Sequence, residues 1–201
     1  MAASPTQVKE LRERTGAGMM NCKKALEDAG GDMDRAITIL KEQGMAVLGK
    51  RASKEASQGV IESYIHAGGK VGVLVELNCE TDFVARTDEF KALAREIGMQ
   101  IAAMAPEIIS AEDLSPERLE EEKRIFRQRA VDEGKPERAL DSIVQGRVEK
   151  MFSHIALLNQ PHVRDDKRTI NDLVSEASGK LGERIVIRRF ARYSIGEALN
   201  G

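Results

Sequence analysis

Few residues of this chain have the types and spacing that a catalytic or metal site requires. The three histidines, His66, His154 and His162, lie far apart, and we expect one at a strand end and two on the surface rather than a shared metal ion. The two cysteines, Cys22 and Cys79, build neither a disulfide framework nor a metal cluster. The sequence therefore predicts no metal site and no bound cofactor.

Cys79 offers one alternative, an enzyme with a nucleophilic thiol and His66 across a hairpin as its base. The strand pattern instead places Cys79 on the same face as Val73 and Val75, which is typical of a core position. A phosphate-binding loop is not indicated either, because Thr15-Gly16-Ala17-Gly18 is not followed by lysine and a hydroxyl residue. These residues favour a binding protein over an enzyme.

A second alternative is RNA binding through a basic segment near the C-terminus, where Arg188, Arg189 and Arg192 alternate with apolar residues. The formal net charge is −2 and aromatic residues make up 3% of the chain. Both the electrostatic attraction and the stacking surfaces that RNA-binding proteins use are therefore weak. We expect a solvated strand face and no direct binding of nucleic acid.

The composition suits a folded protein with a highly charged surface: the 201 residues are 41% hydrophobic and 32% charged. No apolar run approaches the roughly 20 residues that a membrane span needs. The N-terminal residues lack the apolar segment of a secretory signal. We expect a cytoplasmic protein with reduced cysteines and no membrane association.

The first part of the chain predicts a small bundle of three amphipathic helices. They are expected over residues 5–14, 19–29 and 33–43, with Gly44 ending the third. A polar segment over residues 50–57 follows as a linker. We therefore divide the chain into a helical module, residues 1–55, and a larger domain, residues 56–201.

The larger domain predicts an antiparallel sheet packed with helices, so the expected fold class is α+β. Two strands over residues 59–66 and 71–79 form a hairpin, and a last strand over 185–193 pairs with it. Helices are expected over residues 88–104, 116–133, 136–158 and 169–180, with the second and third forming a long helical hairpin and a loop over 160–167.

Two apolar sites are ambiguous at this level. The connection Thr81-Asp82-Phe83-Val84 lies between a strand and a helix, and because most phenylalanines are core residues, composition favours a Phe83 tucked under the loop. Met19 and Met20 start a helix, where they are either core residues or a pliable contact surface.

Two segments of the chain resemble the signatures of the elongation factor Ts family. The first is LRERTGAGMM, residues 11–20, followed by CKKAL, residues 22–26; the second is NCETDFVA, residues 78–85. Their order and separation also fit, and the resemblance continues through Gly134-Lys135-Pro136 to the final strand. Asn21 stands where the family often has aspartate, a change that still suits a helix start.

The resemblance implies a guanine-nucleotide exchange factor that binds elongation factor Tu, both with GDP and without nucleotide, and has no active site of its own. Residues 1–55 would be a ubiquitin-associated-like three-helix domain that docks on this GTPase through Arg12, Met19 and Met20. Residues 56–201 would be the core domain for exchange and dimerisation.

The resemblance also implies a role for Thr81, Asp82, Phe83 and Val84. In the family pattern this loop disturbs the magnesium and phosphate site of the GTPase, which makes Phe83 partner-facing rather than buried. The chain resembles the short form with one core copy, in which two chains pair. The long apolar helices over 90–104 and 140–158, with few long loops to cover them, favour the same homodimer.

Overall fold

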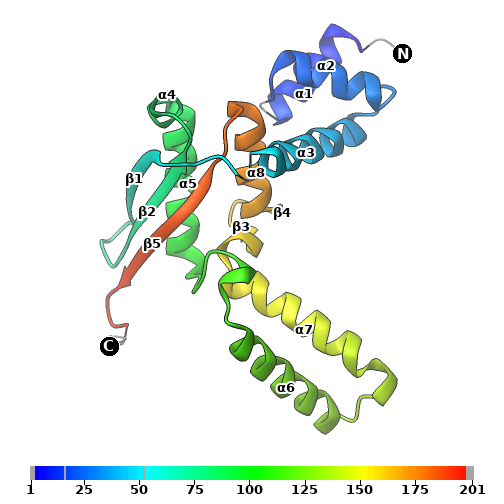
Figure 1. Ribbon diagram of the computed structural model, residues 1–201, viewed down its shortest axis with the longest axis vertical. Coiled ribbons are helices and arrows are strands. Elements are labelled where there is room, and N and C mark those ends of the chain that lie inside the picture. Colours follow the sequence, from blue (N-terminus) through cyan, green and yellow to red (C-terminus); the bar gives the residue numbers. More distant parts are fainter. Residues whose placement is uncertain (1–2, 16, 52, 198–201) are drawn as a thin grey trace. The chain divides into compact units, whose positions relative to one another are not determined.

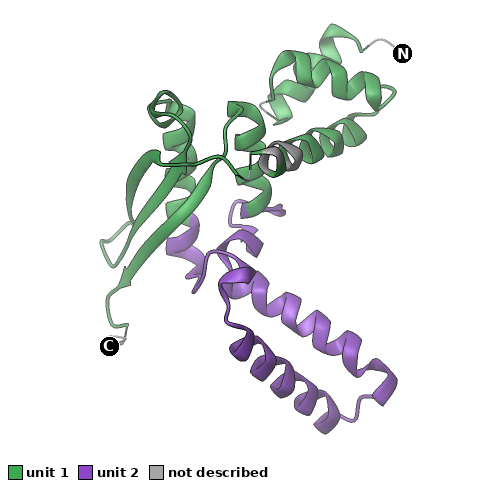
Figure 2. Cartoon of the chain, in the orientation of Figure 1, with its two compact units in different colours: residues 1–99, 171–201 green, residues 100–170 purple. Residues whose placement is uncertain are grey.

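The structure, a computed structural model, describes residues 3–15, 17–51 and 53–197, and it confirms the α+β class. The chain forms two compact units, residues 1–99 with 171–201 and residues 100–170 (Figure 2). The division near residue 55 stays a prediction. Gly16 and Ala52, within the expected helix break and linker, lie outside the described residues.

The first unit begins with a bundle of three helices, α1 (Pro5–Thr15), α2 (Met19–Asp28) and α3 (Met33–Lys50) (Figure 1). Its core consists of Val8, Leu11, Cys22, Ala25, Leu26, Ala29 and Ala36. The prediction that Gly44 ends the third helix was wrong. A Cβ at Gly44 would lie 2.7 Å from the backbone oxygen of Ser175, so this glycine serves a close approach inside a continuing helix.

The sheet of the first unit has the order β1-β2-β5, and both pairs are antiparallel, as the sequence predicted. The strands are β1 (Gln58–Ile65), β2 (Val71–Cys79) and β5 (Val186–Ser194). Alternate residues of β2 from Val73 to Cys79 are buried. Helix α5 (Asp88–Met104) covers this face at Gly98, where a Cβ would lie 3.1 Å from the Cβ of Tyr64.

Two further elements complete the first unit. The short helix α4 (Asp82–Ala85) follows β2 directly, and α8 (Ile170–Leu181) precedes β5. The sequence predicted α8 within a residue at each end, but it gave no helix at α4.

The second unit is built around the predicted antiparallel hairpin of α6 (Pro116–Asp132) and α7 (Leu140–Ile155) (Figure 1). The short 3₁₀ helices η1 (Ala111–Asp113), η2 (Glu137–Ala139) and η3 (Leu157–Asn159) flank these helices. The expected loop over 160–167 was wrong, because β3 (Pro161–His162) pairs with β4 (Asp165–Thr169).

The second unit also corrects the expectation that His162 lies on the surface, since this residue is buried. Next to it, a buried glutamine pair joins α5 to the segment after α7: Gln100 Nε2 donates to Gln160 Oε1 at 3.2 Å. Gln100 also accepts the backbone N–H of Val163 at 2.8 Å. Within the described residues, no helix combines the length and apolar character needed to cross a membrane.

Candidate partner-binding site

The segment Thr81–Val84, which we call the α4 turn, is a capped helix start rather than an irregular connection. Thr81 is the N-cap: its backbone is extended (φ −125°, ψ 153°) and its hydroxyl oxygen accepts the N–H of Val84 at 3.4 Å. Thr87 closes the other end, because its hydroxyl donates to the Val84 carbonyl at 2.8 Å and accepts the N–H of Phe90 at 3.2 Å. The short helix is therefore held at both ends.

The α4 turn directs an aromatic ring into solvent. Phe83 is 81% exposed, so the expectation from composition, a ring tucked under the loop, was wrong. Ala85 on the same helix is buried, and Val84 is half-buried. Asp82 precedes Phe83 in the chain, and its Oδ2 atom lies 2.9 Å from Nη2 of Arg86. One turn of helix thus carries an exposed aromatic ring and an ion-paired carboxylate.

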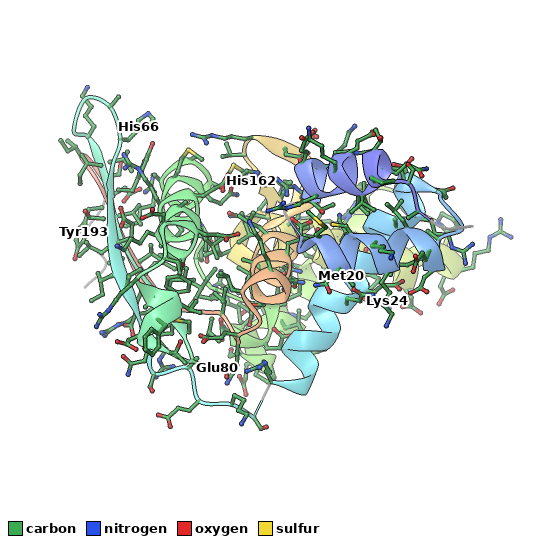
Figure 3. All side chains as sticks on the ribbon, turned by 90° about the horizontal axis from the view of Figure 1, so that it is seen from above. Met20, Lys24, His66, Glu80, His162 and Tyr193 are labelled. Atoms are coloured by element: carbon green, nitrogen blue, oxygen red, sulfur yellow. The ribbon has the colours of Figure 1, made fainter. Side chains whose placement is uncertain are left out.

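Two glutamates hold the base of the α4 turn. Glu183 accepts the N–H of Glu80 at 3.1 Å and the N–H of Thr81 at 3.0 Å, both through Oε2, and the Thr81 hydroxyl at 2.6 Å through Oε1. Glu80, labelled in Figure 3, accepts the N–H of Arg184 at 2.7 Å and Nη1 of Arg51 at 2.6 Å. The Arg184 N–H, followed by Arg51 and opposed by burial, lowers the pKa of Glu80.

Sequence reasoning missed both glutamates. Glu183 lies 102 residues from Thr81, so no local spacing reports their contact. Glu80 is part of the second signature segment, but an acidic residue before an N-cap is common and does not by itself predict a hydrogen-bonded brace. Only the pairing of β2 with β5 brings the two glutamates together.

The thiol at the end of β2 does not form the catalytic pair that we considered. Cys79 is buried, its Sγ atom donates to the Thr81 carbonyl at 3.1 Å, and burial followed by the Glu183 charge raises its pKa to about 11. Such a thiol is protonated near neutral pH and is a poor nucleophile. The strand register pairs Cys79 with Gln58, whereas His66 lies at the other end of the hairpin (Figure 3).

The docking residues implied by the resemblance are Arg12 on α1 and Met19 and Met20 at the start of α2, and we call this set the α2 patch. Met19 is 59% exposed, Met20 is 72% exposed, and Arg12 is exposed on α1. The core alternative for the two methionines was therefore wrong. The N-cap of α2 is Gly18, which makes no side-chain capping hydrogen bond, so the start of α2 lacks the cap that holds the start of α4.

Two of the three arginines of β5 lie in ion pairs, which reduces the basic character of this strand. Arg189 Nε lies 2.6 Å from Oε2 of Glu76 on the neighbouring strand, and Arg192 contacts Glu197. Arg188 is exposed. Over the described part of the chain, no group of three or more acidic, histidine or cysteine side chains is arranged to hold a metal ion.

Comparison with known proteins gives one consistent family. Residues 3–197 match the family described as elongation factor TS. The elongation factor Ts of Desulforamulus reducens is 52% identical over 196 residues, which cover 98% of this chain and 90% of that protein. Those of Thermoanaerobacter sp. (strain X514) and Coprothermobacter proteolyticus are 55% and 54% identical, over 98% of this chain and 96% and 100% of their own lengths. The similarity thus extends along nearly the whole chain.

Proposed function

The chain belongs to the elongation factor Ts family of guanine-nucleotide exchange factors for elongation factor Tu, and on this premise we propose that the α4 turn is the element that opens the nucleotide site of elongation factor Tu. The family is not enzymatic, and the protein acts by binding. The observation that carries the proposal is the 81% exposure of Phe83 on a turn held at both ends. The expected place of action is the cytoplasm.

The mechanism that we propose is physical displacement. GDP is held in a GTPase by phosphate-binding loops and by a magnesium ion that bridges phosphate oxygens. Phe83 and Asp82 enter beside this site and disturb the magnesium and phosphate contacts, while Thr81 and Val84 shape the turn. Exchange then follows from linkage, because the factor weakens GDP binding as much as GDP weakens binding of the factor.

The size of the effect is set by the burial of one ring. Burying a phenylalanine contributes about 1.5–3 kcal/mol, and each tenfold weakening of GDP requires about 1.4 kcal/mol of differential binding. Phe83 therefore accounts for about one to two decades of weakening, and other contacts supply any remainder.

We assign docking to the helical module, residues 1–55, through the α2 patch of Arg12, Met19 and Met20. Residues 56–201 then supply exchange and dimerisation. The exposure of Met19 and Met20 supports this assignment, since methionine side chains adapt to irregular partner surfaces. In this proposal the docking contacts are present whether or not nucleotide is bound. They therefore lower the factor concentration needed for half-maximal GDP release, but they do not set the release rate at saturating factor.

The test is release of fluorescent GDP from purified elongation factor Tu over a range of factor concentrations. Phe83→Ala should lower the release rate at saturating factor by roughly ten- to a hundredfold, which corresponds to the burial energy of one phenylalanine. Val131→Ala is a matched control, because Val131 is also an exposed apolar residue but lies on α6. A saturated rate that is unchanged in Phe83→Ala would refute the proposed role of the turn.

The homodimer that we propose uses a surface different from the one expected. The large apolar residues of α5 and α7 are buried or half-buried within the chain: Phe90, Leu93, Ile97 and Ile101 on α5 and Leu140, Val144 and Val148 on α7 are buried, and Met151, Phe152 and Ile155 are half-buried. A more exposed group of apolar side chains lies on or beside the sheet face opposite α5, and it comprises Ile61, Ile65, Leu74, Tyr193 and Ile195.

The strand register makes the apolar part of this face around Gly72 continuous, whereas Ile61 shares its row with the ion-paired Glu76 and Arg189. Ile65, Gly72 and Tyr193 form one row across the three strands. Leu74 lies next to Ala191 in the adjacent row. Tyr193 is labelled in Figure 3. A Cβ at Gly72 would lie 3.0 Å from Cδ1 of Ile65, so the isoleucine side chain covers the glycine. Sheet faces of this kind stack about 10 Å apart with interdigitated side chains, and a second copy of the chain offers the matching face.

Light scattering at micromolar concentration should give twice the mass of the chain. Leu74→Lys should shift the mass towards one chain, because it places a charge at the centre of the interface. Val131→Lys is the control, since Leu74 and Val131 are both 49% exposed but Val131 lies on α6. A single-chain mass for the unmodified protein across this range would exclude the dimer.

A further inference from the structure

We propose that Glu183 is a positioning residue of the exchange reaction: its carboxylate sets the direction in which α4 presents Phe83. The proposal rests on the role of Phe83 proposed above, and it assigns the orientation of that side chain to a residue 102 positions away from Thr81. Glu183 itself need not touch the partner, because it acts through the backbone of the turn.

The direction of Phe83 has to come from the backbone. With 81% of the residue exposed, the ring has few packing contacts that would hold it. The helix that carries it has only four residues, Asp82–Ala85, too few to be stable on its own. The contacts that fix the backbone of Thr81 and Val84 therefore also fix the Cα–Cβ direction of Phe83.

Glu183 provides that frame at the point where the backbone lacks partners. At the end of β2 and the start of α4, the N–H groups of Glu80 and Thr81 leave the strand pairing and precede the helical pairing. One carboxylate oxygen accepts both. The other accepts the Thr81 hydroxyl at 2.6 Å, which leaves the oxygen of that hydroxyl to accept the N–H of Val84. Glu183 thus orients the N-cap as well as the backbone before it.

The position of Glu183 is itself fixed by the fold. Helix α8 ends at Leu181, and the next residue, Gly182, has a φ of +70°, a left-handed conformation suited to glycine. The Gly182 N–H donates to the backbone carbonyl of Ser178 at 2.9 Å. Two residues after Glu183, Ile185 is only 2% exposed and anchors the start of β5 in the core. The glutamate is therefore carried on a short segment with an anchor on each side.

A second carboxylate closes the contact in the opposite direction. Glu80, at the base of the turn, accepts the backbone N–H of Arg184 at 2.7 Å, while Glu183 accepts the backbone N–H of Glu80. Nη1 of Arg184 donates a hydrogen bond to the backbone carbonyl of Lys54 at 2.6 Å. Hydrogen bonds that cross in both directions resist rotation of the turn about the strand end, which a single bond would not do. The carboxylates of Glu80 and Glu183 strengthen the two backbone hydrogen bonds that they accept, because a charged acceptor forms a stronger bond than a neutral one.

The test combines exchange kinetics with a local optical probe. Glu183→Ala removes all three acceptor contacts, whereas Glu183→Gln keeps one carbonyl oxygen for the backbone N–H groups. Asp113→Asn is the control, because the Asp113 carboxylate accepts the N–H of Ser110 at 2.8 Å in a turn of the second unit. The chain contains no tryptophan, so Phe83→Trp in each background gives a fluorescence anisotropy decay that reports the motion of this side chain alone.

Glu183→Ala should lower the saturated rate of GDP release roughly tenfold, as expected for the loss of charge-assisted hydrogen bonds. The half-saturating concentration should change little, because the α2 patch is intact. The saturated rate of GDP release for Glu183→Gln should lie between the rates of Glu183→Ala and the unmodified protein. In the Phe83→Trp background, Glu183→Ala should add a fast component to the anisotropy decay, and Asp113→Asn should add none.

Two results would overturn the proposal. One is a saturated rate for Glu183→Ala equal to that of the unmodified protein. The other is a lower rate together with a lower melting temperature but an unchanged anisotropy decay, which means a general structural role. If Glu183→Ala does not fold, Glu183→Gln decides the question on the same measurements. Failure of the proposed function is seen separately, as normal release by Phe83→Ala, and the anisotropy still reports whether Glu183 orders the turn.

Discussion

The α4 turn and the α2 patch place apolar side chains in the same local position, the first turn of a helix, but they hold them in opposite ways. Phe83 is 81% exposed and Met20 is 72% exposed. The N-cap of α4 is Thr81, whose hydroxyl accepts a backbone N–H and is itself held by Glu183. The N-cap of α2 is Gly18, which offers no side chain.

The difference matches what each side chain is able to do. Phenylalanine has two side-chain torsions and a flat ring, so fixing its backbone largely fixes the volume that it occupies. Methionine has three torsions and a polarisable sulfur, so its contact surface adapts to a partner even on a fixed helix. A braced phenylalanine suits entry into a defined gap, and unbraced methionines suit adaptable docking.

The largest expected effect is on the free energy of unfolding, and it distinguishes the buried Phe90 from the exposed Phe83. Phe90→Ala should lower the free energy of unfolding by about 3–5 kcal/mol, because Phe90 is fully buried on α5. Phe83→Ala should change it by less than about 0.5 kcal/mol, as is usual for exposed sites. Chemical denaturation of both variants measures this. A large loss in Phe83→Ala would mean that the ring is structural.

A second comparison concerns the two buried thiols, one beneath each site. The pKa of Cys22 is raised by burial, with the hydroxyl of Thr15 and the charge of Arg12 opposing the rise. Burial together with the negative charges of Glu183 and Glu80 raises the pKa of Cys79 to about 11.

Cys22 should therefore react with a thiol reagent before Cys79 does. Since only the thiolate reacts, a pKa of about 11 instead of 9.0 makes the thiolate of Cys79 roughly a hundredfold scarcer at pH 8 than that of an ordinary thiol. The rate at Cys79 should keep rising with pH up to about 11. Rates measured on Cys22→Ala and Cys79→Ala separate the two thiols, and a faster Cys79 would contradict the assignment.

The next effect concerns docking. Met19→Ala with Met20→Ala should raise the half-saturating factor concentration roughly tenfold, because each truncation removes part of the burial energy of a methionine. The saturated release rate should stay the same. Val131→Ala, an exposed apolar residue of α6, is the control. A fall in the saturated rate without a shift in half-saturation would reverse the division between docking and exchange.

Alternation and helical periodicity predicted most of the fold because they report which face of an element is buried. The strands β1, β2 and β5 and their pairing followed from alternating valines and isoleucines near turn residues. The errors arose where a residue is determined by contacts with another part of the chain and not by the helix or loop in which it was expected. Gly44 suggested a helix end, but it allows close contact with the Ser175 backbone. His162 looked like a surface residue, but it lies in a short strand pair.

The residues of the candidate site also divide into those that the sequence predicted and those that it did not. The α4 turn and the α2 patch were found from contiguous motifs, through resemblance to a family. Composition alone placed Phe83 in the core, since it measures what most phenylalanines do and not what this turn exposes. Glu183 was not found, because a long-range hydrogen bond leaves no periodic trace in the sequence. Its contact with Thr81 depends on the order of strands in the sheet.

The smallest expected effect tests whether the missing cap of α2 matters. Gly18 has φ −60° and ψ 144°, which any residue adopts, and a Cβ there would meet only Nδ2 of Asn21, at 3.9 Å. Gly18→Ser should therefore supply a cap and stabilise the protein by a few tenths of a kcal/mol, roughly 0.3–0.5. The melting temperature should rise by about 1–2 °C. Half-saturation in GDP release should stay unchanged, because the adaptability of Met19 and Met20 resides in their side chains. A weaker docking in Gly18→Ser would instead locate that adaptability in fraying of the first turn of α2.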